Sequence, residues 1–313
     1  MSEPTLTIFS TPKPFTLNAH IATIQRNAVA NWKALGDSVA VVLIGDEPGM
    51  ASVARELNTI HIPDVETNAL GTPLLSSIFA QAHQVNHSPL LAFCNTDILL
   101  MPDFIEVAHL VASQFDRFLV VGQRYDLDVR ETLDLTDGWQ GRLAAEIRQR
   151  GRLHPPGGSD YFIFPRGCFE RIPPFAIGRA GWDNWMLFAA RRQGWPLVDA
   201  TGAITIAHQD HDYSHLPNSQ PHYRLPETAE NVRLAGGSRV IFTLRDCSHR
   251  VVEGRVQRAP LTWRRFWREL EIFPLVRLGS KALAQAIFAL LHPRKAWSEL
   301  RAARTTRRNG AGE

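Results

Sequence analysis

The chain alternates between short, continuous apolar runs and longer segments whose apolar residues recur every three or four positions. Residues 6–9 and 39–44 are apolar throughout, as expected of strands that are covered on both faces. Between them, apolar residues from Ile21 to Leu35 recur at helical spacing, and Asn18 stands where a helix N-cap is favoured. These features predict a strand, a helix and a second strand.

The same alternation continues along the chain. Further strands are predicted at residues 59–62, 90–94, 118–121 and 203–207, and further helices at residues 49–57, 73–83, 103–114, 139–149 and 182–193. Strands that alternate with helices predict an α/β fold with a mostly parallel, Rossmann-type sheet flanked by helices. Ligands of such folds bind beyond the carboxyl ends of the strands.

Polar side chains follow the predicted strands at the point where each strand ends. They are Thr11, Lys13, Asp46, Glu47, Asn95, Thr96, Asp97 and Arg124. Because the carboxyl ends of parallel strands share one edge of a sheet, we expect these residues to face one crevice. Lys13, Arg124 and Arg26 on the first predicted helix are candidate partners of phosphate groups. The helix that begins after Gly71 and Thr72 would also present backbone amides to phosphate.

The Asn95-Thr96-Asp97 triplet comes directly after the apolar strand at residues 90–94. A carboxylate in this position is well placed to hold a divalent cation that bridges a diphosphate. An aspartate at a strand end also caps turns, here the turn before Pro102. The triplet by itself does not separate these two interpretations.

A denser group of candidate ligands runs from His208 to His215 and contains three histidines and two aspartates in eight residues. Imidazole together with carboxylate suits Mn²⁺ or another borderline divalent ion better than Ca²⁺. His208 is the preferred ligand because it follows the predicted strand immediately, and His211 is the next candidate. A polar surface loop is the structural alternative.

Asp183 is a candidate general base for an acceptor hydroxyl. It opens a predicted helix between Trp182 and Trp185, whose rings would exclude water and stack on a sugar. A carboxylate near a helix N-terminus also offsets the helix dipole, and this is its structural interpretation.

Asp160 is the competing carboxylate. It follows Gly157, Gly158 and Ser159, a loop that would bring backbone amides close to an acceptor. Asp160 could hold the acceptor or serve as the base, and the residues alone favour Asp183 for the second role.

Composition excludes several classes of protein. The 313 residues are 44% hydrophobic and 21% charged, which excludes a disordered or collagen-like chain. The formal net charge of +3 is too small to favour nucleic acid as a partner. Three cysteines without CxxC spacing favour a reducing compartment over a disulfide framework. With no secretory signal or membrane-spanning segment visible, a cytoplasmic location is predicted.

Positive charge is concentrated in a tail, residues 259–313. The tail holds 11 Lys and Arg against 4 Asp and Glu, a net of +7, so residues 1–258 carry −4. Trp263, Phe266, Trp267 and Leu270 share one face of a predicted helix, with arginines around it. We expect this helix to contact the cytoplasmic face of an anionic membrane or a partner protein, and packing on the chain's own domain is the alternative.

The order of these motifs resembles the GT-A-type nucleotide-diphospho-sugar transferases, glycosyltransferases of family-2-like organisation. The motifs are Thr-Pro-Lys-Pro-Phe after the first strand, Gly-Asp-Glu after the second, the triplet at 95–97, the Gly-Gly-Ser-Asp loop, the Trp-Asp-Asn-Trp helix and His208. The resemblance covers roughly residues 5–225. It implies a transferase domain at 1–258, with a donor half at about 1–130 and an acceptor half at about 131–258, before the tail at 259–313.

The resemblance also implies roles for single residues. Asp97 would hold Mn²⁺ or Mg²⁺ together with His208, although the family usually has an acid where this chain has Asn95. Asp183 corresponds to the general base of inverting members. Thr11 and Asp46 correspond to positions near the donor nucleoside. The implied partners are a UDP- or GDP-linked sugar and a carbohydrate or glycolipid acceptor.

Three other functions compete with a transferase. A sugar-nucleotide pyrophosphorylase would need a glycine-rich loop after the first strand, and residues 11–14 contain no glycine. A metal-dependent hydrolase built on the cluster from His208 to His215 would need more carboxylates at strand ends. A degenerate carbohydrate-binding or scaffold protein would agree with the neutral Asn95 in the triplet.

Overall fold

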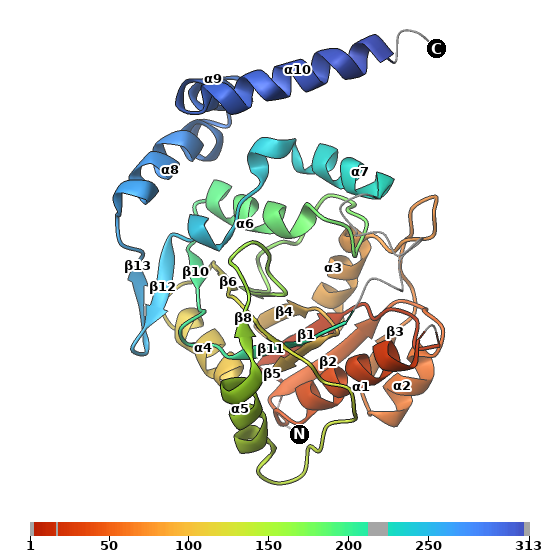
Figure 1. The fold of residues 1–313 in the computed structure, drawn as a ribbon. Coiled ribbons are helices and arrows are strands. Elements are labelled where there is room, and N and C mark those ends of the chain that lie inside the picture. Colours follow the sequence, from red (N-terminus) through yellow and green to blue (C-terminus); the bar gives the residue numbers. More distant parts are fainter. Residues whose placement is uncertain (1–2, 17, 212–224, 310–313) are drawn as a thin grey trace.

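A nine-stranded, mostly parallel sheet with helices on both faces forms the centre of the molecule (Figure 1). The structure is a computed structural model that describes residues 3–16, 18–211 and 225–309. In spatial order the strands are β13 (Arg255–Arg258), β12 (His249–Val252), β10 (Leu197–Asp199), β6 (Leu119–Val121), β9 (Tyr161–Pro165), β4 (Leu90–Cys94), β1 (Leu6–Ser10), β2 (Val39–Ile44) and β3 (Ile60–Ile62). Only β9 and β13 run antiparallel to their neighbours within these described strands. The predicted α/β class is confirmed.

Alternate residues of each central strand bury opposite faces of this sheet. In β4, Leu91 and Phe93 belong to one apolar core, whereas Leu90, Ala92 and Cys94 belong to the other. The first core is covered by α3 (Leu75–Gln84) and α6 (Trp182–Arg192), and the second by α1 (Ala19–Lys33), α2 (Met50–Glu56) and α4 (Asp103–Ala112). Burial on both faces explains why these strands are apolar without a break.

A smaller sheet lies beside the carboxyl end of β4. Its strands in order are β5 (Ile98–Leu100), β11 (Ile206–Gln209), β7 (Tyr125–Leu127) and β8 (Arg152–Leu153). The helix α5 (Trp139–Arg150) covers it with Trp139, Leu143 and Ile147. The strand expected at residues 203–207 is therefore shifted, because β11 begins at Ile206 and includes His208.

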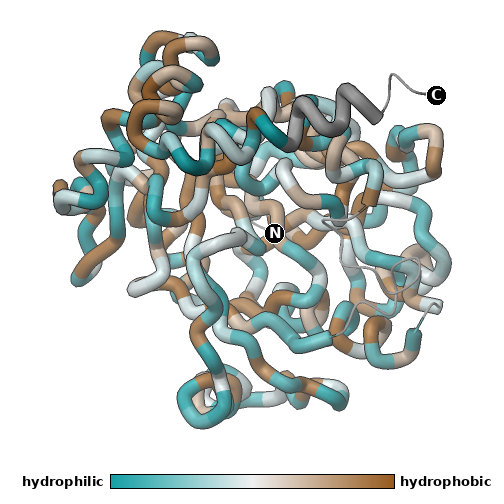
Figure 2. Tube along the Cα trace, turned by 45° about the horizontal axis from the view of Figure 1, so that its top comes forward, coloured by the Kyte–Doolittle hydropathy of each residue, from teal (hydrophilic) through white to brown (hydrophobic). Residues whose placement is uncertain are grey.

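The tail is a chain of helices along the edge of the molecule, beyond α6 and α7 (Pro226–Ala235) (Figures 1 and 2). It consists of α8 (Trp263–Phe273), a π-helical turn η5 (Pro274–Leu278), α9 (Lys281–Leu291) and α10 (Pro293–Asn309), and two short 3₁₀ helices, η3 (Ser238–Val240) and η4 (Leu244–Asp246), precede it. On the inner face of the tail, Ile272, Val276 and Ala284 are buried and belong to the first core. Among the described helices, none combines the length and apolarity that crossing a bilayer requires.

Candidate functional site

A cleft of about 800 Å³ opens at the carboxyl ends of β1 and β4. Most of the residues predicted from the strand ends and loops line it: Thr11, Lys13, Asn95, Thr96, Asp97, Arg124, Gly158, Ser159, Asp160, Trp182, Asp183, His208 and His211. Glu47, Gly71 and Thr72 line it as well. The crevice expected from the strand order thus brings donor-side and acceptor-side candidates together.

Four predicted site residues lie outside the lining of this cleft. Arg26 forms an ion pair with Glu56, and Trp185 packs against Phe175 with 5.3 Å between ring centroids. Asp46 and Gly157 are the other two, although their neighbours Glu47 and Gly158 do line the cleft. Trp182 reaches the cleft with only a small part of its surface, because its ring is packed against Phe93 and Phe162.

Helix α1 fixes the loop that carries the Asn95-Thr96-Asp97 triplet. Asn18 caps this helix as predicted, since its side chain accepts hydrogen bonds from the backbone amides of the first turn. Thr96 Oγ1 donates to Gln25 Oε1 at 3.1 Å, and Trp32 Nε1 donates to the carbonyl of Ile98 at 2.9 Å. Buried hydrogen bonds on both sides of Asp97 therefore hold its backbone in place.

The Asp97 carboxylate faces two imidazoles. Its Oδ2 lies 3.1 Å from His211 Nε2 and 3.8 Å from His208 Nε2. One ligand atom from each of the three residues lies within 4.8 Å of the others. The pairing of β11 with β5 places His208 opposite Ile98, directly after Asp97, and this register brings the late histidine to the triplet.

The electrostatics of this cluster favour a carboxylate beside a neutral imidazole. Burial alone would raise the pKa of Asp97, but the charges of His208 and Lys13 and the hydrogen bond from His211 hold this pKa well below its usual range. Burial lowers the pKa of His208, and the nearby Asp97 charge only partly offsets this effect. Above the lowered pKa of His208, its imidazole is neutral while Asp97 is still a carboxylate, and these are the protonation states that metal ligands require.

The donor set fits a divalent cation. Asp97 Oδ1 and His208 Nδ1 are buried and have no hydrogen-bond partner within the described part of the chain. Buried polar atoms without partners are rare and call for an unseen water or ion. One carboxylate and two imidazoles suit Mn²⁺ or a similar borderline ion. The remainder of the predicted histidine cluster, Asp212 to His215, lies outside the described residues.

Asp126 is a member of the site that was not predicted from the sequence. It lies on β7 opposite His208 on β11, and its Oδ1 is 3.6 Å from His208 Nδ1. Asp126, His208 and Asp210 form a second group of potential metal ligands. The local signal was weak, since Asp126 stands in an ordinary alternation of polar and apolar residues two positions after Arg124, and only the strand register reveals its neighbour.

The two candidate bases have different environments. Asp160 Oδ1 accepts hydrogen bonds from Arg124 at 2.7 Å and from Asn95 Nδ2 at 3.1 Å, so its charge is already neutralised. Asp183 has no such cation within the described residues, and its carboxylate accepts hydrogen bonds from the backbone amides of Asn184 and, at 3.3 Å, Gly181. Burial raises the pKa of Asp183, and the charge of Asp160 adds to this effect.

Two cations of the cleft are held by neighbouring groups. The backbone of Lys13 is fixed by Gln25, which accepts from its amide at 2.6 Å and donates to its carbonyl at 3.0 Å. Burial lowers the pKa of Lys13, and the charge of Asp97 opposes this. Arg124 bridges Asp160 and Asp126 at 2.7 and 3.0 Å. Both cations line the cleft that contains Asp97.

No protein-family model matches the chain, and no curated protein shows a significant match. Among solved structures, it is similar to glucosyl-3-phosphoglycerate synthase of M. tuberculosis, with 14% identity over 75% of this chain and 81% of that chain and a TM-score of 0.47. The complex of that enzyme with Mn²⁺, UDP and phosphoglyceric acid is 13% identical over 75% of this chain and 79% of that chain, with a TM-score of 0.46. Its complex with phosphoglyceric acid alone is 12% identical over 83% of this chain and 88% of that chain, with a TM-score of 0.45. These similarities are similarities of fold.

Proposed function

We propose that this protein is a metal-dependent glycosyltransferase that moves a sugar from a UDP- or GDP-linked donor to a hydroxyl of a carbohydrate or glycolipid acceptor. One observation carries the proposal. A buried Asp97 carboxylate with one unpartnered oxygen faces two histidines, at the carboxyl end of a parallel strand, within a cleft of about 800 Å³. A cleft of this size accommodates a nucleotide sugar.

The donor half, about residues 1–130, would bind the nucleoside diphosphate. Asp97, His208 and His211 are the residues that would hold Mn²⁺ or Mg²⁺. Such an ion neutralises the charge that develops on a departing diphosphate. Lys13 and Arg124 line the same cleft and supply further positive charge for the phosphates. Thr11, whose buried Oγ1 has no partner within the described residues, is available to the donor.

The acceptor half, about residues 131–258, would position and activate the acceptor hydroxyl. Asp183 takes the proton from this hydroxyl while the oxygen attacks the anomeric carbon and the bond from that carbon to the diphosphate breaks, which inverts the anomeric configuration. The loop at Gly158 and Ser159 lies beside the base, because a Cβ on Gly158 would be 4.0 Å from Asp183 Oδ2. Its small residues leave space for an acceptor.

Asp160 is assigned a positioning role. Its carboxylate already accepts hydrogen bonds from Arg124 and Asn95, which hold it in place beside the triplet. It instead connects the Gly158 loop to the triplet that carries Asp97. The neutral Asn95, where the resemblance implies an acid, thus has a partner of its own.

A thermal-shift panel tests the proposal. UDP, GDP, CMP and ADP are each added with and without Mn²⁺ to the wild type, to Asp97→Ala and to Asp116→Ala, a control whose exposed carboxylate does not line the cleft. We expect one nucleotide to raise the melting temperature only with Mn²⁺, in the wild type and in the control but not in Asp97→Ala. If no nucleotide stabilises the wild type, donor binding is refuted.

A metal-dependent hydrolase is the second candidate, and the second ligand group favours it. Asp126, His208 and Asp210 adjoin the first group and share His208, as pairs of metal sites in phosphoryl hydrolases share ligands. Asp126 is, however, already paired with Arg124 and with His154 at 2.8 Å. Rapid release of a sugar phosphate and a nucleoside monophosphate from a nucleotide sugar, unchanged by Asp183→Asn and by added acceptors, would favour the hydrolase.

A further inference from the structure

Helix α8 presents its apolar side chains to the outside of the molecule. The exposed fraction is 72% for Trp263, 44% for Phe266, 39% for Trp267, 42% for Leu270 and 50% for Phe273. These positions recur every three or four residues and form one stripe along the helix. A surface helix of a globular protein normally buries such a stripe in the core.

The opposite face of α8 is charged and lies against the protein. Glu269 forms an ion pair with Arg191 of α6 at 2.6 Å, and Arg268 pairs with Asp246 at 2.7 Å. The Asp246 side chain is only 3% exposed. Turning the helix to bury its aromatic stripe would break these pairs and leave buried charges without partners, which is costly. The orientation of α8 is therefore fixed with its apolar face outward.

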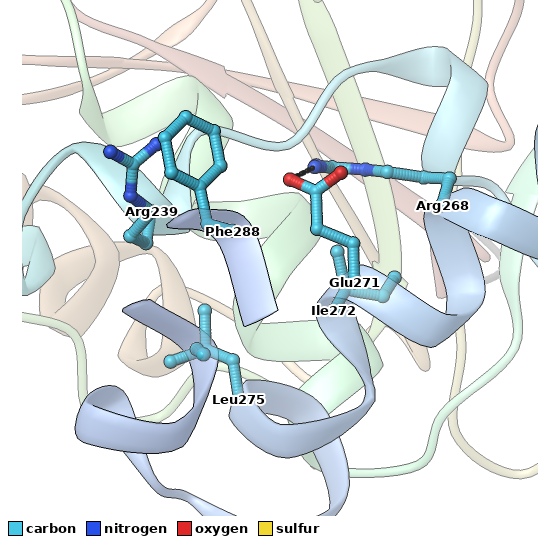
Figure 3. Close-up of a pocket in the computed structure, with 7 residues that line it drawn as sticks. Arg239, Arg268, Glu271, Ile272, Leu275 and Phe288 are labelled. Carbon is cyan, nitrogen blue, oxygen red and sulfur yellow. Dashed lines mark hydrogen bonds and ion pairs between the residues drawn. The ribbon is translucent and has the colours of Figure 1, made fainter. Parts of the chain in front are cut away.

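The packing behind α8 and α9 is nearly complete. Figure 3 shows Arg268 and Glu271 joined by an ion pair, with Phe288 of α9 nearby. The Arg239 guanidinium lies over the Phe288 ring at 3.3 Å from its centroid. The hollow between these side chains has a volume of only about 10 Å³. The tail is thus seated on the domain by its inner face, and no space remains there for the outward side chains.

Exposed apolar side chains continue through the rest of the tail. We define the outer tail surface as the stripe of α8 together with the large exposed residues that follow it: Leu278, Leu283, Leu290, Trp297 and Leu300. Leu290 is 80% exposed. Isolated exposed leucines are ordinary, whereas ten large apolar residues on the consecutive segments α8, η5, α9 and α10 mark an interaction surface.

The charges around this surface are of one sign. The acidic residues of the described tail are all engaged in ion pairs, Glu269 with Arg191, Glu271 with Arg268 and Glu299 with Arg239. Basic residues are exposed and form no ion pair with a described residue: Arg264, Arg277, Lys281, Arg294 and Lys295. The uncompensated charge beside the apolar surface is therefore positive.

We propose that the outer tail surface binds the face of an anionic lipid bilayer, with its tryptophan and phenylalanine rings among the headgroups and its basic residues against lipid phosphates. Aromatic and leucine side chains flanked by Lys and Arg suit this interface, where each basic residue contributes about 1 kcal/mol. A second copy of the chain is a poorer occupant. In a two-fold symmetric contact this surface meets itself, and the same basic side chains would face one another.

Co-sedimentation with vesicles tests the proposal independently of any enzymatic activity. The full chain is mixed with vesicles of phosphatidylcholine alone or of phosphatidylcholine with phosphatidylglycerol, at low and high salt. We expect binding to the anionic vesicles to be at least roughly tenfold tighter and to weaken with salt. No binding, or equal binding to both kinds of vesicle at both salt concentrations, would overturn it.

Matched variants locate the binding surface. Trp263→Ser combined with Trp267→Ser should abolish sedimentation, and Arg264→Gln combined with Lys281→Gln should remove the preference for anionic vesicles. Leu70→Ser is the control, because Leu70 is 72% exposed but lies far along the chain from the tail. If Leu70→Ser and the tryptophan variant bind vesicles equally, the tail is not the binding surface.

Two further measurements keep the result decisive if a variant misfolds. Acyl chains brominated near the headgroup should quench tryptophan fluorescence of the wild type, because three of its eight tryptophans, Trp263, Trp267 and Trp297, are on the outer tail surface. Light scattering gives the oligomeric state without lipid. A wild-type dimer that the tryptophan variant dissociates, with no quenching by brominated lipid, would assign the surface to a second copy and refute the proposal.

Discussion

The cleft and the outer tail surface depart from ordinary burial in opposite directions. The cleft places carboxylates, imidazoles and cations where solvent hardly reaches, as with Asp97 and His208, whereas the tail exposes rings such as Trp263 to solvent. Both arrangements cost free energy in the isolated protein. Each arrangement therefore agrees with the ligand proposed for it, a charged, metal-assisted ligand in the cleft and a lipid surface at the tail.

The difference also shows which interactions hold each region. In the cleft, apolar strands are the scaffold and charged groups are presented to the ligand. In α8 the roles are exchanged, because ion pairs such as Arg268 with Asp246 are the scaffold and the apolar side chains are presented. Substitutions that remove a presented group should change binding or activity, and those that remove a scaffold group should change stability.

Asp183→Asn should have the largest effect. If Asp183 is the general base, the variant loses roughly 10² to 10⁴ in kcat, while the metal-dependent thermal shift with nucleotide persists. The measurement is the steady-state rate of sugar transfer beside the same thermal-shift assay. Asp116→Asn is the matched control because that carboxylate is exposed and does not line the cleft. A variant with near wild-type kcat would exclude Asp183 as the base.

The pH dependence of kcat sharpens this test. Only the carboxylate form of Asp183 accepts a proton, and burial raises its pKa above the ordinary 3.8. The rate should therefore increase with pH through a midpoint above 3.8 on the acid side. A profile that stays flat down to the ordinary value would contradict the assignment of this residue.

Arg268→Ala should weaken the scaffold of the tail. It leaves the buried Asp246 carboxylate without its guanidinium and removes a cation–π contact with Phe242, which has a distance of 5.3 Å. Because Arg268 is partly solvated, we expect a loss of about 2 kcal/mol in the free energy of unfolding, less than for a fully buried pair. Urea unfolding measures it. Arg264→Ala, in the same helix but without an ion pair to a described residue, should change stability by less than about 0.5 kcal/mol. Equal losses in the two variants would show that the pair does not anchor α8.

The helices and strands near the N-terminus could be predicted because the patterns that determine them are local in sequence. Continuous apolar runs, helical spacing and the Asn18 cap each depend on residues close in sequence, and β1, α1, β2 and β4 appear where expected. β9 was missed although Tyr161 to Phe164 is an apolar run. Its insertion between β4 and β6 in antiparallel direction is a long-range pairing that composition does not encode.

The residues of the candidate site also fall into those that local sequence predicts and those that long-range strand pairing brings in. The triplet and the late histidines were predictable from residue type and their place near strand ends. Asp126 was not, because its proximity to His208 depends on the register between β7 and β11. The tail is a third case. Its amphipathic pattern is local, but the face that lies inward is decided by Arg191 and Asp246, which are distant in sequence from the ends of that pattern.

Asp103 provides a buried charge outside both regions and should have a modest effect on stability. Its Oδ2 accepts a hydrogen bond from Thr205 N at 3.0 Å, its Oδ1 is buried without a partner among the described residues, and burial raises its pKa to about 6. The folded state thus binds the proton more tightly than the unfolded state. The resulting stabilisation is fully present below about pH 4 and is lost as the pH rises through about 6.

Asp103→Asn should remove this pH dependence. Solvent reaches part of the group, so we expect the difference in unfolding free energy between wild type and variant to change by only about 1 kcal/mol between acid and neutral pH. Thermal unfolding across that range measures it. A difference that does not vary with pH would mean that the pKa of Asp103 is the same in both states.

Arg26→Ala should have the smallest effect. It tests whether a residue outside the cleft lining contributes to nucleotide binding. Arg26 was a sequence candidate for phosphate binding, but its guanidinium pairs with Glu56 at the exposed surface and does not line the cleft. We expect its loss to change stability by less than about 0.5 kcal/mol and the nucleotide thermal shift not at all. Arg124→Ala is the contrasting variant, because Arg124 lies in the cleft between Asp160 and Asp126, and its loss should weaken the shift. If Arg26→Ala instead reduced the shift as much as Arg124→Ala, the donor would extend over α1, beyond the residues that line the cleft.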